Sequence, residues 1–203
     1  MSSQAIEYFL VPNSPWTYLG HQRLRDIAAR NGATIEPLPF DLGGQVFPIS
    51  GGLPLAKRAP QRQAYRLVEL QRFSDWLGIP LIPQPAFFPV QGNDAAHLII
   101  ATDLAHGAAA ALDLAGRVGS AIWAQQRNVA DPAVLAALLA EAGLPSALMA
   151  QATEAAVTTR YADYTREARE LGVFGAPSYV IDGEIFWGQD RLDFVERRLQ
   201  ARA

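Results

Sequence analysis

Apolar residues in this chain form short continuous runs, typical of buried strands, and longer stretches with helical spacing. Ile6–Val11 is a short apolar run and predicts a buried strand. The stretch from Pro15 to about Asn31 has helical spacing, and Ser14 is a favourable N-cap for it. Thr34–Phe40 predicts a second strand, which its proline confines to a sheet edge. Strand, helix and strand in this order favour a parallel pair joined by a right-handed crossover.

Between residues 41 and 160 the pattern turns helical. A glycine- and proline-rich stretch, Asp41–Pro60, comes first, and its length is typical of a functional surface loop. The apolar spacing then predicts helices over Gln61–Leu77, Asp94–His106, Ala108–Gln125, Pro132–Ala142 and Glu154–Leu171. In the first of these helices the residues expected to face inward are Tyr65, Val68, Phe73 and Trp76.

The last part of the chain returns to strands. Ser178–Ile181 and Glu184–Trp187 are rich in β-branched and aromatic residues, and Asp182-Gly183 between them is a strong hairpin signal. Ala176-Pro177 precedes the first of these strands. A cis bond is expected there, because cis costs little only before proline. An amphipathic helix follows, and Asp190 is expected to cap it.

The predicted order is therefore β-α-β, a run of helices, and α-β-β-α. With a proline at the entry to the third strand, this order is that of an α/β thioredoxin-like fold with an all-helical insertion. We predict a thioredoxin-like domain formed by residues 1–42 and 160–203, and an inserted helical domain formed by residues 43–159.

Composition narrows the possible functions. The 203 residues carry a net charge of −3, which favours neither nucleic acid nor an anionic membrane as a partner. No apolar run approaches a membrane span, and the N-terminus lacks the features of a signal peptide, so a cytoplasmic location is expected. The chain has no cysteine, which excludes disulfides, thiolate metal sites and catalysis by a protein thiol. His21, His97 and His106 show no metal-ligand spacing, so we expect no metal, and structural or surface roles for them.

Ser14 has two possible roles. A Ser-Pro pair at a helix start, taken alone, is most often only a cap. The same position offers free N–H groups and the positive end of the helix dipole, which favour a bound anion. Because this fold order places Ser14 opposite a strand entered by a proline, we expect Ser14 to do more than cap the helix, and the family resemblance carried by the motifs below makes it the candidate catalytic residue.

Three motifs carry a resemblance to a known family. Ser14-Pro15-Trp16-Thr17 stands where thioredoxin-like oxidoreductases have Cys-x-x-Cys. With Phe174-Gly175-Ala176-Pro177 and Phe186-Trp187-Gly188-Gln189-Asp190-Arg191, it resembles the 2-hydroxychromene-2-carboxylate isomerase family. That family is related to the kappa-class glutathione transferases and to the DsbA fold. The resemblance spans nearly the whole chain, including Asp131-Pro132-x-Val134-Leu135 and the loop Gly43–Pro54.

The resemblance implies that glutathione supplies the thiol that the chain lacks, and that Ser14 hydrogen-bonds its sulfur. The glutathione-binding residues it implies are Ser14, Arg62, Ala176, Pro177, Gly188, Gln189, Asp190 and Arg191. A second pocket, for a small aromatic carboxylate, is assigned to Trp16, Phe47, Gly52, Phe88 and Trp187, although large aromatic residues more often belong to a core.

The activity implied is the interconversion of 2-hydroxychromene-2-carboxylate and trans-o-hydroxybenzylidenepyruvate in naphthalene-type catabolism, by reversible thiolate addition. A kappa-like glutathione transferase or peroxidase, and a non-catalytic glutathione-binding protein, stay open. A homodimer is also left open.

This chain departs from the family pattern at four places. It has Arg62 for a lysine, Glu69 for an aspartate, Gly52 for an asparagine, and Gln91 for the asparagine of a Phe-Pro-x-Asn motif. These departures fall mainly on the substrate side. We therefore expect the use of glutathione to match the family more closely than the identity of the second substrate does.

Overall fold

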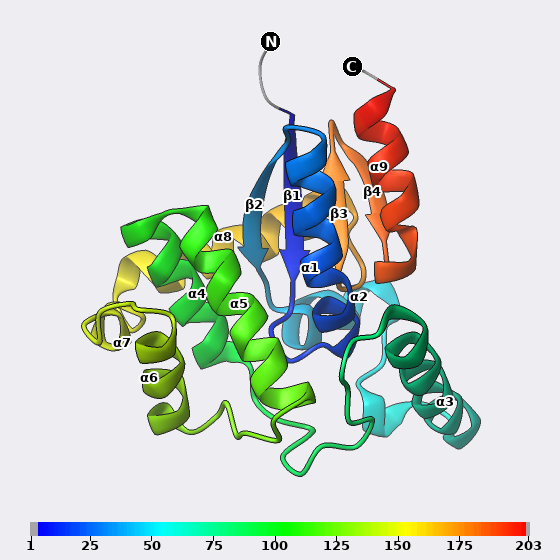
Figure 1. Cartoon of the computed structure of the whole chain (residues 1–203), viewed down its shortest axis with the longest axis horizontal. Coiled ribbons are helices and arrows are strands. Elements are labelled where there is room, and N and C mark those ends of the chain that lie inside the picture. Colours follow the sequence, from blue (N-terminus) through cyan, green and yellow to red (C-terminus); the bar gives the residue numbers. More distant parts are fainter. Residues whose placement is uncertain (1–3, 202–203) are drawn as a thin grey trace.

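The computed structural model describes residues 4–201 and is built around a four-stranded sheet with the order β2-β1-β3-β4 (Figure 1). The strands are β1 (Ala5–Leu10), β2 (Thr34–Pro39), β3 (Ser178–Ile181) and β4 (Glu184–Trp187). β1 and β2 are parallel, while β3 is antiparallel to both of its neighbours. The predicted parallel pair is confirmed, and β2, which contains Pro37, lies at the predicted edge.

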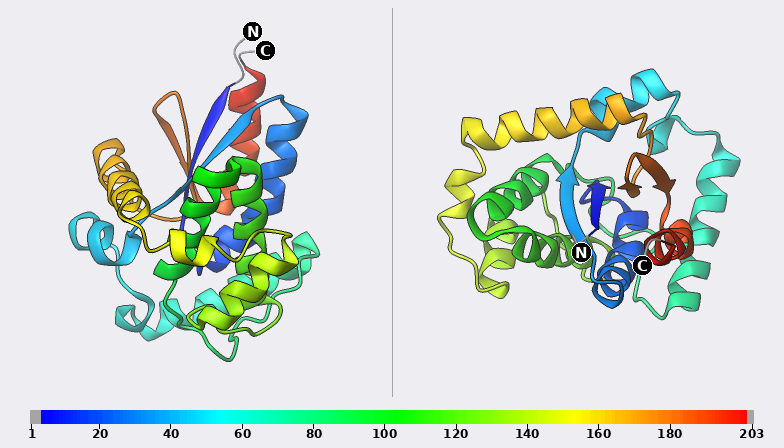
Figure 2. Two further views of the ribbon diagram at one scale, coloured as in Figure 1. Left: turned by 90° about the vertical axis from the view of Figure 1, so that its left-hand side faces the viewer. Right: turned by 90° about the horizontal axis from the view of Figure 1, so that it is seen from above.

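Three helices cover the two faces of the sheet. α1 (Pro15–Arg30) and α9 (Leu192–Gln200) pack on one face, and α8 (Ala155–Leu171) runs across the other (Figure 2). The α1 helix buries its predicted inner residues, Leu24, Ile27 and Ala28. The sequence and the structure thus agree on a DsbA-like α/β fold.

The β3–β4 hairpin turns at Asp182 and Gly183, as predicted. Their φ angles are 51° and 79°. Both central residues of a type I′ turn need positive φ, which the Asp-Gly pair adopts readily. Ile181 and Glu184 therefore pair directly across the turn.

The remaining helices lie beside β2 and around one end of the sheet (Figures 1 and 2). They are α2 (Phe47–Ser50), α3 (Pro60–Leu77), α4 (Asn93–His106), α5 (Ala108–Trp123), α6 (Pro132–Glu141) and α7 (Leu148–Gln151). The predicted helices are present, with ends that differ by one or two residues, whereas α7 was not predicted. The expected loop over residues 41–60 contains a π-helical turn (Leu42–Val46), α2 and a 3₁₀ turn (Leu55–Lys57).

The apolar core is continuous from the sheet into these helices. Ile6 of β1, Leu24 of α1, Ile99 of α4 and Val118 of α5 belong to one cluster of buried side chains. A second cluster lies beneath α8 on the opposite face of the sheet. The division into two domains at residues 42 and 160 stays a prediction. None of the helices within residues 4–201 has the length and apolarity needed to cross a membrane.

The inward face predicted for α3 is wrong. Tyr65, Val68 and Trp76 are 54%, 45% and 72% exposed. The buried residues of this helix are instead Arg66, Leu70 and Ser74. Of the four residues predicted to face inward, only Phe73 packs against the core. Because α3 carries apolar residues on two of its sides, helical spacing alone does not identify the face that meets the core.

Candidate active site

The candidate site lies at the end of the two central strands, where β1 ends and β3 begins. This end of the strands is called the sheet edge from here on. Phe9 pairs with Ser178, so the chain leaving β1 toward Ser14 passes the residues that precede β3. β4 ends at the same edge, where the Gly188 N–H donates to the Pro177 carbonyl at 2.9 Å. In Figure 1 this edge is the lower end of the sheet, beside α2 and α3.

Ser14 occupies the N-cap of α1, as predicted. Its Oγ accepts a hydrogen bond from the Thr17 N–H at 3.3 Å. The Ser14 side chain is only partly buried. Because the cap bond uses an oxygen lone pair, the hydroxyl proton stays available for donation to a ligand. Capping and anion binding are therefore compatible roles for this residue.

Ala176 presents open backbone groups at the same edge. Within residues 4–201, neither its N–H nor its carbonyl has a hydrogen-bond partner. The Ala176–Pro177 bond is cis, and a second cis bond, Phe88–Pro89, was not predicted. Open backbone groups beside a strand can pair with an extended peptide. The Ala176 backbone is thus a place where such a peptide can pair, at the end of the sheet from which β1 leads to Ser14.

The segment after β4 differs in part from its prediction. Gln189 is buried, and its carbonyl and its side-chain Oε1 accept hydrogen bonds from Arg23 Nη1 at 3.1 and 3.0 Å. Asp190 does not cap α9, so that prediction is wrong. A 3₁₀ turn (Gln189–Arg191) precedes the helix, and the Asp190 carboxylate accepts instead from Arg191 Nη1 at 2.7 Å.

Comparison with known proteins agrees with this geometry. Residues 5–200 match the DSBA-like thioredoxin domain family. Proteins named 2-hydroxychromene-2-carboxylate isomerase are similar: one from Pseudomonas putida is 30% identical, with 94% of this chain and 92% of that protein covered. Another, from Sphingobium xenophagum, is 28% identical, with 97% and 98% covered.

The chain belongs to the DSBA-like thioredoxin family and, within it, to the 2-hydroxychromene-2-carboxylate isomerase family. A solved structure of an isomerase of that name superposes with a TM-score of 0.82 at 27% identity, covering 97% of this chain and 95% of the other. A probable DsbA oxidoreductase from Streptomyces coelicolor, at 19% identity and a TM-score of 0.76, covering 98% of this chain and 89% of the other, shares the fold.

In this family member the aromatic residues predicted for the second pocket lie in separate pairs. Trp16 packs edge-on against Phe73, with ring centroids 5.9 Å apart. Phe88 lies 4.7 Å from Trp123. Trp187 lies 4.7 Å from Phe174 and closes over Gly175, beside the Ala176–Pro177 bond. The remaining two, Phe47 and Gly52, touch each other, because the Phe47 ring fills the space where a side chain at Gly52 would lie.

Arg62, the last predicted glutathione residue, is exposed in the first turn of α3. It raises the local positive charge: burial, and then the nearby Arg62 guanidinium, lower the pKa of Arg58. The structure therefore places the predicted site residues in two groups, one at the sheet edge and one around the start of α3.

The histidines stand apart from these groups. His21 is buried, and its Nε2 donates to the Leu112 carbonyl at 2.8 Å. Nδ1 then accepts from the Tyr8 hydroxyl, 3.4 Å away, which fixes the neutral tautomer. His97 packs edge-on against Tyr161, and His106 is exposed. Over residues 4–201, no cluster of three or more histidine, aspartate or glutamate side chains is arranged to hold a metal.

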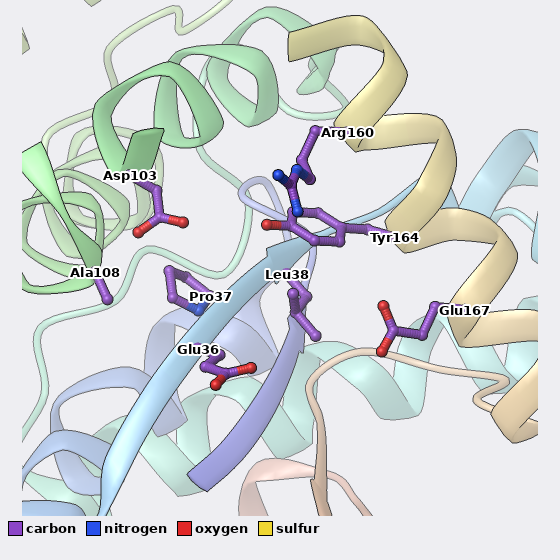
Figure 3. A pocket seen from close by; sticks show the side chains of 8 residues that line it. All are labelled: Glu36, Pro37, Leu38, Asp103, Ala108, Arg160, Tyr164 and Glu167. Atoms are coloured by element: carbon purple, nitrogen blue, oxygen red, sulfur yellow. The ribbon is translucent and has the colours of Figure 1, made fainter. Parts of the chain in front are cut away.

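A cavity of about 290 Å³ lies elsewhere, between β2, α4 and α8 (Figure 3). Glu36, Asp103 and Glu167 surround it together with Arg160 and Tyr164. None of the predicted site residues lines it. The candidate site is therefore the sheet edge near Ser14 and not this acidic cavity.

Arg66 is a buried residue near the predicted pocket that the sequence did not indicate. This arginine is 8% exposed, and its guanidinium carbon lies 5.2 Å from the Phe88 ring centre and 5.6 Å from that of Trp123. Arginine is almost never fully buried unless it is paired, so its residue type gave no reason to place it on the inner face of α3. Its spacing to Leu70 and Ser74, four and eight residues further on, was the only signal in the sequence.

Proposed function

We propose that this protein is an enzyme that uses glutathione to interconvert 2-hydroxychromene-2-carboxylate and trans-o-hydroxybenzylidenepyruvate. The observation that carries the proposal is the Ser14 hydroxyl at the start of α1, at the end of the sheet where the Ala176 backbone has no partner within residues 4–201, in a chain without cysteine. Proteins named as isomerases align with almost the whole chain and support the choice of reaction.

Glutathione fits this edge on two grounds. The N–H and carbonyl of Ala176, which have no partner among the described residues, suit the backbone of its cysteine residue in an antiparallel arrangement. The start of α1 suits its sulfur, because free N–H groups and the helix dipole favour an anion. Bound there, glutathione supplies a thiolate nucleophile that is regenerated at the end of the isomerisation.

Ser14 has a defined part in this scheme. Its hydroxyl donates a hydrogen bond to the sulfur, while its oxygen keeps the Thr17 N–H in place. Together with the helix start, that bond lowers the thiol pKa from its reference value of about 8.5. Each unit of pKa depression corresponds to about 1.4 kcal/mol of thiolate stabilisation.

The segment after β4 would hold the γ-glutamyl end of glutathione. The Asp190 carboxylate is partly exposed and can meet an ammonium group, with Arg191 as its present partner. The buried Gln189, held by Arg23, fixes the position of this segment against α1. We assign the reaction to the cytoplasm, where glutathione is kept reduced.

The test has two measurements on the intact protein. Titration calorimetry with glutathione should show one binding site, and the chromene carboxylate should be isomerised only when glutathione is present, as followed by ultraviolet absorbance. Binding without isomerisation, together with conjugation of an aryl halide electrophile, would identify a transferase instead. The absence of any heat with millimolar glutathione would rule out both.

A further inference from the structure

Arg66 is a buried cation for which residues 4–201 provide no counter-ion. Arg66 is only 8% exposed, and within residues 4–201 its guanidinium has neither a hydrogen-bond acceptor nor an ion-pair partner. Phe88 and Trp123 contact the guanidinium but offer no acceptor for its N–H groups. A buried charge that lacks a partner is costly, so it indicates a place where an anion is to be bound.

The surroundings of Arg66 reinforce this need for an anion. Burial, and then the neighbouring Arg58, lower the pKa of Arg66 to about 10, so it stays charged at neutral pH. Arg58 is itself close to Arg62, and its Nε donates to the Leu53 carbonyl at 2.8 Å. Trp123 Nε1 is buried and also lacks an acceptor within residues 4–201. Both Arg66 and the Trp123 indole beside it are thus donors without an acceptor in the part of the chain that the structure describes.

Two sets of contacts connect Arg66 to the catalytic edge. Phe88, on which the guanidinium lies, is two residues from Val90, and the Val90 carbonyl accepts from Asn13 Nδ2 at 2.6 Å. Asn13 directly precedes Ser14. On the same helix as Arg66, Phe73 packs against Trp16, two residues after Ser14. Arg66 is therefore linked to the start of α1 through the Phe88–Val90 loop and through α3 itself.

We propose that Arg66 binds the carboxylate of the aromatic acid substrate, with Arg58 and Arg62 adding positive charge around it. This assignment rests on the proposed function. The planar guanidinium suits a carboxylate bidentately, and the neighbouring Phe88 ring suits the aromatic part of the same ligand. The reacting carbon is thereby held toward Ser14, while the acid group stays anchored at α3.

Glutathione also has carboxylates, so the experiment separates the two sources. The probe is 3-(2-hydroxyphenyl)propanoate, which has no double bond for a thiol to attack, and its control is the corresponding propanol, which lacks the carboxylate. Calorimetry compares wild type with Arg66→Met, Arg66→Lys and Arg72→Met. Arg72 is an exposed arginine on the same helix and serves as the matched control.

We expect Arg66→Met to weaken binding of the propanoate about ten- to a hundredfold, because a charge-assisted contact is lost. Its affinities for the propanol and for glutathione should not change. The propanoate affinity of Arg66→Lys should lie between those of wild type and Arg66→Met, since an ammonium keeps the charge but not the planar pair of donors. Arg72→Met should bind all three ligands as wild type does.

Three outcomes overturn the assignment. The first is wild-type protein that does not bind the propanoate, and the second is Arg66→Met binding it unchanged. The third is that Arg66→Met loses affinity for glutathione but keeps the wild-type affinity for γ-glutamylcysteine, which would assign Arg66 to the glycyl carboxylate. A packing role alone would lower the melting temperature of Arg66→Met and leave its propanoate affinity intact. These binding measurements do not depend on turnover, so they stand even where the isomerase assay fails.

Discussion

Asn13 and Val90 join the start of α1 to the loop that carries Phe88. The Asn13 amide donates to the Val90 carbonyl at 2.6 Å, across 77 positions of sequence. Gly92 lies against the same amide, where an added Cβ would be 3.0 Å from Asn13 Cγ. The residue before Ser14 and the loop beside Arg66 are therefore held in one arrangement, which relates the two groups of site residues.

Asn13→Ala should loosen this loop. Loss of one hydrogen bond costs about 1 kcal/mol, and we expect faster amide hydrogen exchange in residues 86–92 together with weaker binding of the aromatic probe. Asn31→Ala is the control, because it removes a side-chain bond to the Ile27 carbonyl at the other end of α1. If exchange in residues 86–92 is the same in both variants, the Asn13 bond does not position the loop.

Ser14→Ala should separate thiolate stabilisation from helix capping. Loss of a hydrogen bond to a charged group costs about 1.5–3 kcal/mol, which predicts roughly a ten- to hundred-and-fiftyfold lower rate at neutral pH, with partial recovery at higher pH. The ultraviolet absorbance of the bound thiolate, titrated against pH, should show a raised thiol pKa.

The control for Ser14→Ala is Asp131→Ala, which removes the N-cap bond that Ala133 N–H makes in α6 at 2.9 Å. Both variants should lose about 1 kcal/mol of stability, but only Ser14→Ala should lose turnover per folded molecule. Overlapping thiolate titration curves for wild type and Ser14→Ala would leave Ser14 as a cap alone.

Gly20→Ala should destabilise the contact between α1 and the segment after β4. A Cβ at Gly20 would lie 2.7 Å from the Tyr179 hydroxyl oxygen and 2.9 Å from Gln189 Cβ. Such overpacking costs about 1–3 kcal/mol, and it outweighs the roughly 1 kcal/mol by which alanine favours a helix. Gly43→Ala, where nothing lies within 4 Å, should change stability by less than about 0.5 kcal/mol in urea unfolding. Equal midpoints for the two variants would contradict the close approach at Gly20.

His21 should make the protein less stable in acid. Burial lowers the pKa of His21 to about 4, whereas an unfolded histidine has a pKa of about 6.5. Below pH 6.5 the unfolded chain takes up a proton that the folded chain refuses, so the free energy of unfolding falls as the pH drops from 6.5 to 4. The loss attributable to this residue is about 3 kcal/mol over that window.

Urea unfolding at several pH values checks this expectation. His21→Gln, whose amide can still donate to the Leu112 carbonyl, should show a shallower fall in stability between pH 6.5 and 4 than wild type. His106→Gln alters an exposed side chain and should keep the wild-type slope. Parallel curves for wild type and His21→Gln would mean that His21 is protonated in the folded protein.

Local signals in the sequence were enough for the parts of the fold that depend on neighbouring residues. Ser14 and Pro15 begin α1, and the turn at Asp182 and Gly183 adopts the positive φ angles that its residue types favour. These features were predictable because each depends on the conformational preferences of a few consecutive residues.

Contacts between distant segments were not predictable in this way. The sequence did not indicate that Arg23 would hold Gln189, or that Asn13 would meet Val90. Asp190 is a good capping residue by type, yet the chain enters α9 through a 3₁₀ turn in which Arg191 takes the carboxylate. Local preference was overridden there by the way the segment packs on α1.

The sequence by itself determined the order of strands and helices, the serine at the start of α1 and the absence of any protein thiol. Only the tertiary structure decided which side of α3 meets the core, and hence that Arg66 is buried against the rings of Phe88 and Trp123. The reason is physical: α3 has apolar residues on two sides, so its orientation depends on surfaces contributed by α1, α5 and the loop after α3. Those surfaces come together only when the whole chain has folded.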